Sequence, residues 1–67
     1  MATITFTSLH GTTLSGRTVS DTKIKGQRVY FVKMLKKVYA ITDGYAIDEA
    51  EESADMDEFT QQVALQL

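Results

Sequence analysis

Seven carboxylates lie within eleven consecutive positions, in the segment DEAEESADMDE at residues 48–58, and no Lys or Arg follows them. Spaced carboxylates can steer a basic protein surface toward them, and they can imitate a row of phosphates. A charge run is also typical of a solvated loop that keeps a protein in solution. Metal binding is the weakest interpretation, because DMDEF lacks the glycine and the twelve-residue ligand spacing of a calcium loop.

Part of this acidic segment has a structural explanation. Asp55, Asp57 and Glu58 fall where a helix is predicted to begin, and the helix dipole stabilises such carboxylates by roughly 0.3–1 kcal/mol each. The four carboxylates within 48–52 repel one another, and a small chain has little stability to offset repulsion. We therefore predict that the segment recognises a basic surface of a larger protein. The predicted partner-binding residues, two apolar anchors included, are Asp48, Glu49, Glu51, Glu52, Asp55, Tyr45 and Leu65.

The basic residues are grouped earlier, all seven of them between residues 17 and 37. A basic strand that also carries Tyr30 and Phe31 is the kind of surface that sheets use on nucleic acid. This alternative is weakened by the acidic segment downstream, which repels phosphates, and by the lack of a glycine and aromatic RNA-binding pattern. Its predicted nucleic-acid contacts are Lys23, Lys25, Arg28, Lys33, Lys36 and Lys37. A second interpretation is that these cations shield sheet edges and pair with the acidic segment.

Enzyme chemistry finds little support in the sequence. His10 is the only side chain suited to act as a base at neutral pH, and no nucleophile motif or phosphate-binding glycine loop accompanies it. His10 stands beside Gly11 in a predicted turn, where an ordinary surface histidine is expected. We therefore predict a protein that is not an enzyme. A further alternative is a homo-oligomeric assembly subunit that joins copies of itself, as a dimer for example, through exposed strands and Leu65.

Length and composition limit how the chain is held together. It has 67 residues without Cys, Pro or Trp, which predicts one domain that buries only about 60% of its unfolded surface. Disulfides and a structural zinc site are excluded because there is no Cys and only one His, and we expect no cofactor or metal. Oligomerisation or a bound partner remains as a source of extra stability. Residues 1–37 carry a net charge of +6 and residues 38–67 a net charge of −8.

The N-terminal sequence MATITFTSLHG has no basic flank and no apolar stretch, so no signal peptide is expected. The longest apolar run is far shorter than the roughly 18–20 residues that cross a bilayer, so we expect no membrane contact. These features predict a soluble, cytoplasmic protein of the source or host cell. Its size and segregated charge are similar to those of small modulators or inhibitors encoded by viruses and mobile elements, which is a fold-level analogy only.

Hydrophobic periodicity predicts a series of strands. In TITFTS, Ile4 and Phe6 alternate with threonines, as in a half-buried strand. HGTTLSG at 10–16 is expected to be a turn or loop, and residues 17–24 are expected to run extended. QRVYFVKML at 27–35 has β-branched and aromatic residues on both faces, which predicts a central strand.

The next segment predicts a hairpin. KVYAIT at 37–42 reaches Asp43 and Gly44, a dipeptide typical of two-residue hairpin turns, and YAI continues beyond it. The expected pairs are Thr42 with Tyr45, Ile41 with Ala46 and Ala40 with Ile47. Residues 46–54 stay ambiguous, because Ile47, Ala50 and Ala54 are also spaced at helical intervals.

From Asp55 the pattern predicts a helix over 56–66. Asp55 as N-cap with Glu58 three positions later resembles a capping box. Met56, Phe59, Val63 and Leu67 form one apolar stripe, while Leu65 lies on the opposite face and is expected to be exposed. The predicted fold class is α+β, a small antiparallel meander of three to five strands followed by a C-terminal helix packed on one face.

Overall fold

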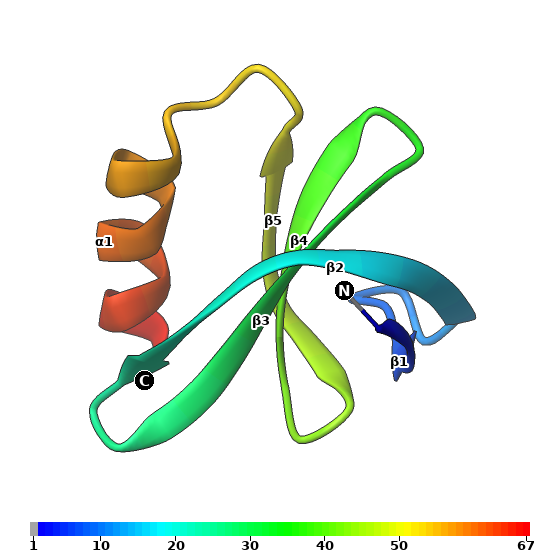
Figure 1. Ribbon diagram of the computed structural model, residues 1–67, viewed down its shortest axis with the longest axis horizontal. Helices are drawn as coiled ribbons and strands as arrows, with labels where there is room; N and C mark the ends of the chain where they lie inside the picture. The colour runs from blue at the N-terminus through cyan, green and yellow to red at the C-terminus, as the bar shows by residue number, and fades with distance from the viewer. Residues whose placement is uncertain (1) are drawn as a thin grey trace.

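The computed structural model describes residues 2–67 and shows five strands followed by one helix (Figure 1). The elements are β1 Thr3–Thr7, β2 Thr13–Ile24, β3 Gln27–Met34, β4 Lys37–Thr42, β5 Tyr45–Glu51 and α1 Met56–Gln66. Each strand from β1 to β4 pairs antiparallel with the next one in the chain. The predicted α+β meander with a C-terminal helix is therefore confirmed.

Strand β3 is the centre of the fold, as its sequence predicted. It pairs with β2 on one side and β4 on the other, and Val29, Phe31 and Val32 are all buried. Because side chains alternate along a strand, Phe31 and Val32 bury opposite faces of the same sheet. Two apolar clusters therefore form, one on each face, and a different part of the chain must shield each from water.

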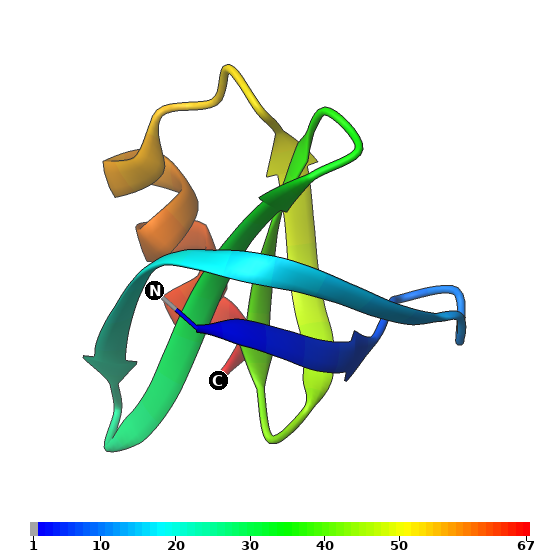
Figure 2. The same cartoon turned by 45° about the vertical axis from the view of Figure 1, so that its right-hand side comes forward.

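The inner cluster lies where the sheet closes on itself. It contains Phe6, Val32, Tyr39, Ile41 and Ala46, contributed by four strands. Closure occurs between β1 and β5, which run parallel at the single pair Thr7 and Tyr45, with the Thr7 N–H donating to the Gly44 carbonyl at 2.8 Å. The predicted meander is thus a closed barrel, in which β1 and β2 cross over the inner face (Figure 2).

Strand β2 makes this crossing possible. Its first half pairs with β1 and its second half with β3, with a register shift between Thr18 and Ser20. The expectation of a loop over 10–16 is wrong for residues 13–16, which belong to β2. Gly16 had suggested a turn, but a Cβ there would lie only 2.5 Å from Val32 Cγ1. This glycine permits close approach across the inner cluster, a second common use of glycine in strands.

The hairpin of β4 and β5 is confirmed. Asp43 and Gly44 have φ angles of 53° and 80°, as a two-residue hairpin turn requires. The pairs of Thr42 with Tyr45 and of Ile41 with Ala46 form as expected. The third expected pair is wrong, because a register shift makes Ala40 face Asp48 and leaves Ile47 as the extra residue. The ambiguity over 46–54 is resolved as strand as far as Glu51.

Helix α1 covers the outer face of the sheet (Figure 1). Phe59 and Val63 are buried against Val29, Phe31, Val38 and Ala40, and the rings of Phe31 and Phe59 meet at 5.9 Å between centroids. These six residues form the outer cluster. Met56 and Leu67, the other members of the predicted stripe, pack against it. Leu65 is 86% exposed, as expected. In the described part of the chain, no helix is long and apolar enough to cross a membrane.

The outer cluster predicts the effect of truncating Phe59. Changing Phe59 to Ala should cost about 3–5 kcal/mol of unfolding free energy, because it removes a fully buried ring and leaves a cavity. A 67-residue chain has a margin of only a few kcal/mol, so much of the variant should be unfolded at 25 °C. Urea denaturation followed by circular dichroism measures this. The control Leu65→Ala should shift stability by less than about 0.5 kcal/mol, and equal effects would contradict this packing.

The close approach at Gly16 predicts a coupled effect. Gly16→Ala should destabilise the protein by about 1–3 kcal/mol through overpacking against Val32. In the double variant Gly16→Ala with Val32→Ala the clash is relieved. Its loss of stability, measured by the same denaturation, should therefore be smaller than the sum of the two single losses. Additive losses would show that Val32 does not limit the space at Gly16.

Candidate functional site

The acidic segment lies at one end of the barrel, where the β5–α1 connection passes the β3–β4 turn (Figures 1 and 2). The Glu52 N–H donates to the Lys36 carbonyl at 3.1 Å, which ties the two connections together. Residues 48–51 are strand rather than loop. The carboxylates in that stretch therefore point alternately to the two faces of the sheet.

Two predicted partner-binding residues are held by contacts within the protein. Asp48 faces α1, where one carboxylate oxygen accepts from Gln62 Nε2 at 3.0 Å and the other from the Glu49 N–H at 2.8 Å. Glu49 faces the other way and forms an ion pair with Lys37 at 3.7 Å. Of the four carboxylates within 48–52, Asp48 and Glu49 therefore have partners inside the protein, and Glu49 has a cationic one.

The remaining carboxylates at this end are exposed. Within residues 2–67 the structure has two ion pairs, Arg28–Asp21 and Lys37–Glu49, and neither uses a carboxylate of residues 51–58. We define the acidic end as Glu51, Glu52, Asp57 and Glu58, all of which are exposed. This arrangement leaves four negative charges available to another molecule, while residues 2–67 contain no group of carboxylates suited to hold a metal ion.

A small hollow lies beside the acidic end, between β5 and α1. Its volume is about 190 Å³, and Ala50, Ala54 and Phe59 form its apolar part. Asp55 and Glu58 also line it. Asp55 is the N-cap of α1, as predicted, and its Oδ1 accepts from the Asp57 and Glu58 N–H groups at 2.8 and 3.3 Å. Since both bonds end on Oδ1, the other oxygen of Asp55 remains available to a cation.

The two predicted apolar anchors do not adjoin the acidic end. Tyr45 is the first residue of β5 and Glu51 the last, so roughly 20 Å of strand separates them. Leu65 stands near the far end of α1. Leu35, which sequence reasoning placed at the end of a strand, is instead in the β3–β4 turn with φ 54° and is 70% exposed. The Glu52 N–H contacts the carbonyl of the next residue, so this exposed apolar residue lies nearer the acidic end than the two predicted anchors do, and no pattern in the sequence had indicated it.

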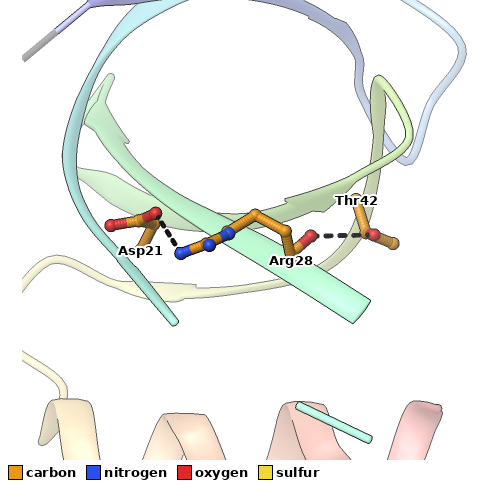
Figure 3. Close-up of polar contacts among 3 residues, drawn as sticks. All are labelled: Asp21, Arg28 and Thr42. Carbon is orange, nitrogen blue, oxygen red and sulfur yellow. Dashed lines mark hydrogen bonds and ion pairs between the residues drawn. The ribbon is translucent and has the colours of Figure 1, made fainter. Parts of the chain in front are cut away.

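The six predicted nucleic-acid contacts divide between the two ends of β3. Lys33, Lys36 and Lys37 are near the β3–β4 turn, beside the acidic end. Lys23 and Arg28 face each other across β2 and β3 at the other end, with Lys25 in the turn between them. Arg28 pairs with Asp21 at 2.9 Å, and its carbonyl accepts from Thr42 Oγ1 at 3.1 Å (Figure 3). The predicted pairing of cations with the acidic segment is therefore found for Lys37 and not for Arg28.

A larger pocket, which sequence reasoning missed, opens at the end of the barrel that carries Arg28. Its volume is about 480 Å³, and Ile4, Thr18, Asp21, Tyr30 and Ile41 are among its lining residues. We call it the Tyr30 pocket. These side chains come from four strands, so no local pattern in the sequence could have revealed it. His10, in contrast, lies exposed in the β1–β2 connection, away from both hollows.

The structural role of Asp55 can be separated from its charge. Asp55→Ala removes the N-cap and should lower the unfolding free energy by about 0.5–2 kcal/mol. Asp55→Asn keeps an oxygen that can accept from the same N–H groups, so it should retain most of that stability while it removes the charge. Thermal unfolding of the two variants measures the difference, and equal losses would show that charge rather than capping is responsible.

Comparison with protein-family models, with curated proteins and with solved structures found no match to this chain.

Proposed function

We propose that this protein is a non-enzymatic interaction protein that binds and occludes a basic surface of a larger protein. The observation that carries the proposal is the hollow between β5 and α1, where Asp55 and Glu58 stand beside the buried ring of Phe59. Glu58 belongs to the acidic end, and Glu51, Glu52 and Asp57 are exposed nearby in the same segment of the chain. The proposal includes action as a modulator or inhibitor in the cytoplasm of the source or host cell, in the manner of small viral proteins.

The hollow has the chemistry that a lysine or arginine side chain requires. Such side chains place an aliphatic stem on apolar surface and keep the charged head near polar groups. Ala50, Ala54 and Phe59 provide the apolar surface, and Asp55 and Glu58 provide the carboxylates. A volume of about 190 Å³ is suited to one side chain rather than to a separate small molecule, because ligand pockets usually exceed about 300 Å³.

The carboxylates of the acidic end would act while a basic partner approaches, and then at the edge of the contact with it. Unpaired surface carboxylates raise the rate of encounter with a basic partner and make that rate dependent on salt. Leu35, at 70% exposure, supplies an apolar contact beside them. In this arrangement Asp48 and Glu49 stabilise the acidic end from within, through Gln62 and Lys37, and do not touch the partner.

Neutralising the acidic end tests the proposal. The variant Glu51→Gln, Glu52→Gln, Asp57→Asn and Glu58→Gln should bind a lysine- and arginine-rich peptide about tenfold or more weakly than the wild type. Each exposed pair contributes roughly 0.2–1 kcal/mol, and a factor of ten is about 1.4 kcal/mol. Titration calorimetry at low and moderate salt measures this. The wild-type affinity should fall as salt rises.

A matched comparison separates the hollow from general charge. Glu58→Gln and Asp43→Asn each remove one negative charge, but Asp43 lies in the turn at the other end of β5. Only Glu58→Gln should weaken peptide binding measurably. If the two variants bind the peptide equally, the proposed site is wrong.

Two other results would favour the alternatives raised by the sequence. In a pull-down from a cell lysate, retained material that disappears on nuclease treatment would favour nucleic acid as the partner. Light scattering that shows mass rising with concentration would favour a homo-oligomeric subunit instead. The proposed function requires a protein that is retained after nuclease treatment, is released by salt and is not retained by the quadruple variant.

A further inference from the structure

The Tyr30 pocket has the size and lining of a small-molecule site. Its volume of about 480 Å³ falls within the range of roughly 300–1,000 Å³ that is usual for such sites. Ile4 and Ile41 provide apolar walls, and Tyr30 is 36% exposed. The pocket lies at the end of β3 remote from the acidic end, so it is independent of the proposed protein-binding function.

A threonine that lines the pocket has a buried hydroxyl without a partner among residues 2–67. Thr18 is 5% exposed and faces the inner side of the barrel opposite Val32, and its Oγ1 forms no hydrogen bond within the described part of the chain. Nearly all buried polar side-chain atoms in proteins are hydrogen-bonded, so this hydroxyl calls for a donor or acceptor. Thr18 lines the pocket, and rotation of its side chain about the Cα–Cβ bond can turn the buried hydroxyl toward an occupant with a polar edge.

Two cations lie beside the pocket, on the strands that carry Asp21 and Tyr30. Arg28 forms an ion pair with Asp21, which lines the pocket (Figure 3). The Arg28 side chain is 53% exposed. Lys23 lies directly opposite Arg28 on the same face of β2 and β3. A second hollow of about 520 Å³, lined by Arg28 and Asp43, adjoins the pocket through Tyr30 and Gly44.

These charges favour an anionic group on the side of Lys23. A guanidinium has five N–H donors, so Arg28 can hold an anion while it keeps its bond to Asp21. Asp21 is compensated by that bond, whereas Asp43 repels an anion from the second hollow. The cation pair of Arg28 and Lys23 is therefore the place for a negative charge.

We propose that the Tyr30 pocket binds a nucleotide. The base enters the apolar cavity and stacks on Tyr30, its polar edge hydrogen-bonds to Thr18 Oγ1, and the phosphate is held by Arg28 and Lys23. Stacking on an aromatic ring combined with a cation for the phosphate is how proteins bind unpaired nucleotides. The same chemistry is present in a free mononucleotide and in one residue of a single strand.

The test is a titration of ¹⁵N-labelled protein followed by NMR. Adenosine monophosphate and uridine monophosphate are the probes. Two comparison compounds form the other arms of the titration: adenosine, which lacks the phosphate, and ribose 5-phosphate, which lacks the base. A mononucleotide should shift the amide signals of Thr18 and Tyr30, and both arms should bind more weakly. A hexanucleotide of the same base identifies the source: tighter binding indicates a single strand, and equal binding indicates a free nucleotide.

The variant Thr18→Val distinguishes a binding role from a structural one. Valine has the same shape but no hydroxyl, so nucleotide affinity should fall about fivefold to tenfold through loss of one hydrogen bond. The free variant should unfold at a higher temperature than the wild type, because an unpaired buried polar group has been removed. Thr22→Val, on the same strand but facing the opposite side, is the control and should bind as the wild type does.

Three results would overturn the proposal. One is the absence of any shift at Thr18 and Tyr30 with millimolar mononucleotide and with the hexanucleotide. Another is equal binding of ribose 5-phosphate and the mononucleotides, which would show that only charge is recognised. The third is wild-type affinity in Thr18→Val.

Discussion

The fold depends on one constraint, which is that β3 and β4 carry apolar side chains on both faces. Phe31 and Ala40 face outward, and Val32 and Tyr39 face inward, all in adjacent positions of two paired strands. Both faces of such a sheet must be shielded from water, yet few residues remain to shield them. The chain uses the helix α1 for the outer face and folds its own β1 and β2 over the inner face. Each cover is thin, so the loss of a single buried group, such as the ring of Phe59, has a large effect.

Irregular positions in the strands allow the second cover to form. The first half of β2 pairs with β1 and the second half with β3, so the strand must bend between the two partners. The register shift between Thr18 and Ser20 provides that bend. Gly16 lets β2 pass close to Val32. The same crossing leaves the barrel incompletely filled at the end where Tyr30 and Ile41 lie, which is where the Tyr30 pocket opens. The pocket is thus a consequence of how a short chain closes a barrel.

The distribution of charged residues follows from the same arrangement of strands. β3 runs from the turn that carries Lys25 to the turn that carries Leu35 and Lys36, so the basic segment is divided between the two ends of the molecule. At one end it meets the acidic segment, and Lys37 compensates Glu49 there. At the other end Lys23 and Arg28 remain away from that segment. The charge separation of the sequence is therefore only partly cancelled in space. The molecule has one predominantly acidic end, and at its other end lie Lys23 and Arg28, of which Arg28 pairs with Asp21.

The amino-acid sequence by itself determined the local features, because each rests on neighbouring residues. The alternation around Phe6, the turn at Asp43 and Gly44, the cap at Asp55 and the stripe of Phe59 and Val63 follow from strand, turn and helix chemistry. Tertiary structure alone decided the closure at Thr7 and Tyr45, the register shift that places Ala40 opposite Asp48, and the strand role of Gly16. It also decided which carboxylates stay exposed and which side chains line the Tyr30 pocket. These depend on pairings between residues distant in the chain, where a shift of one position reverses the face of every side chain that follows.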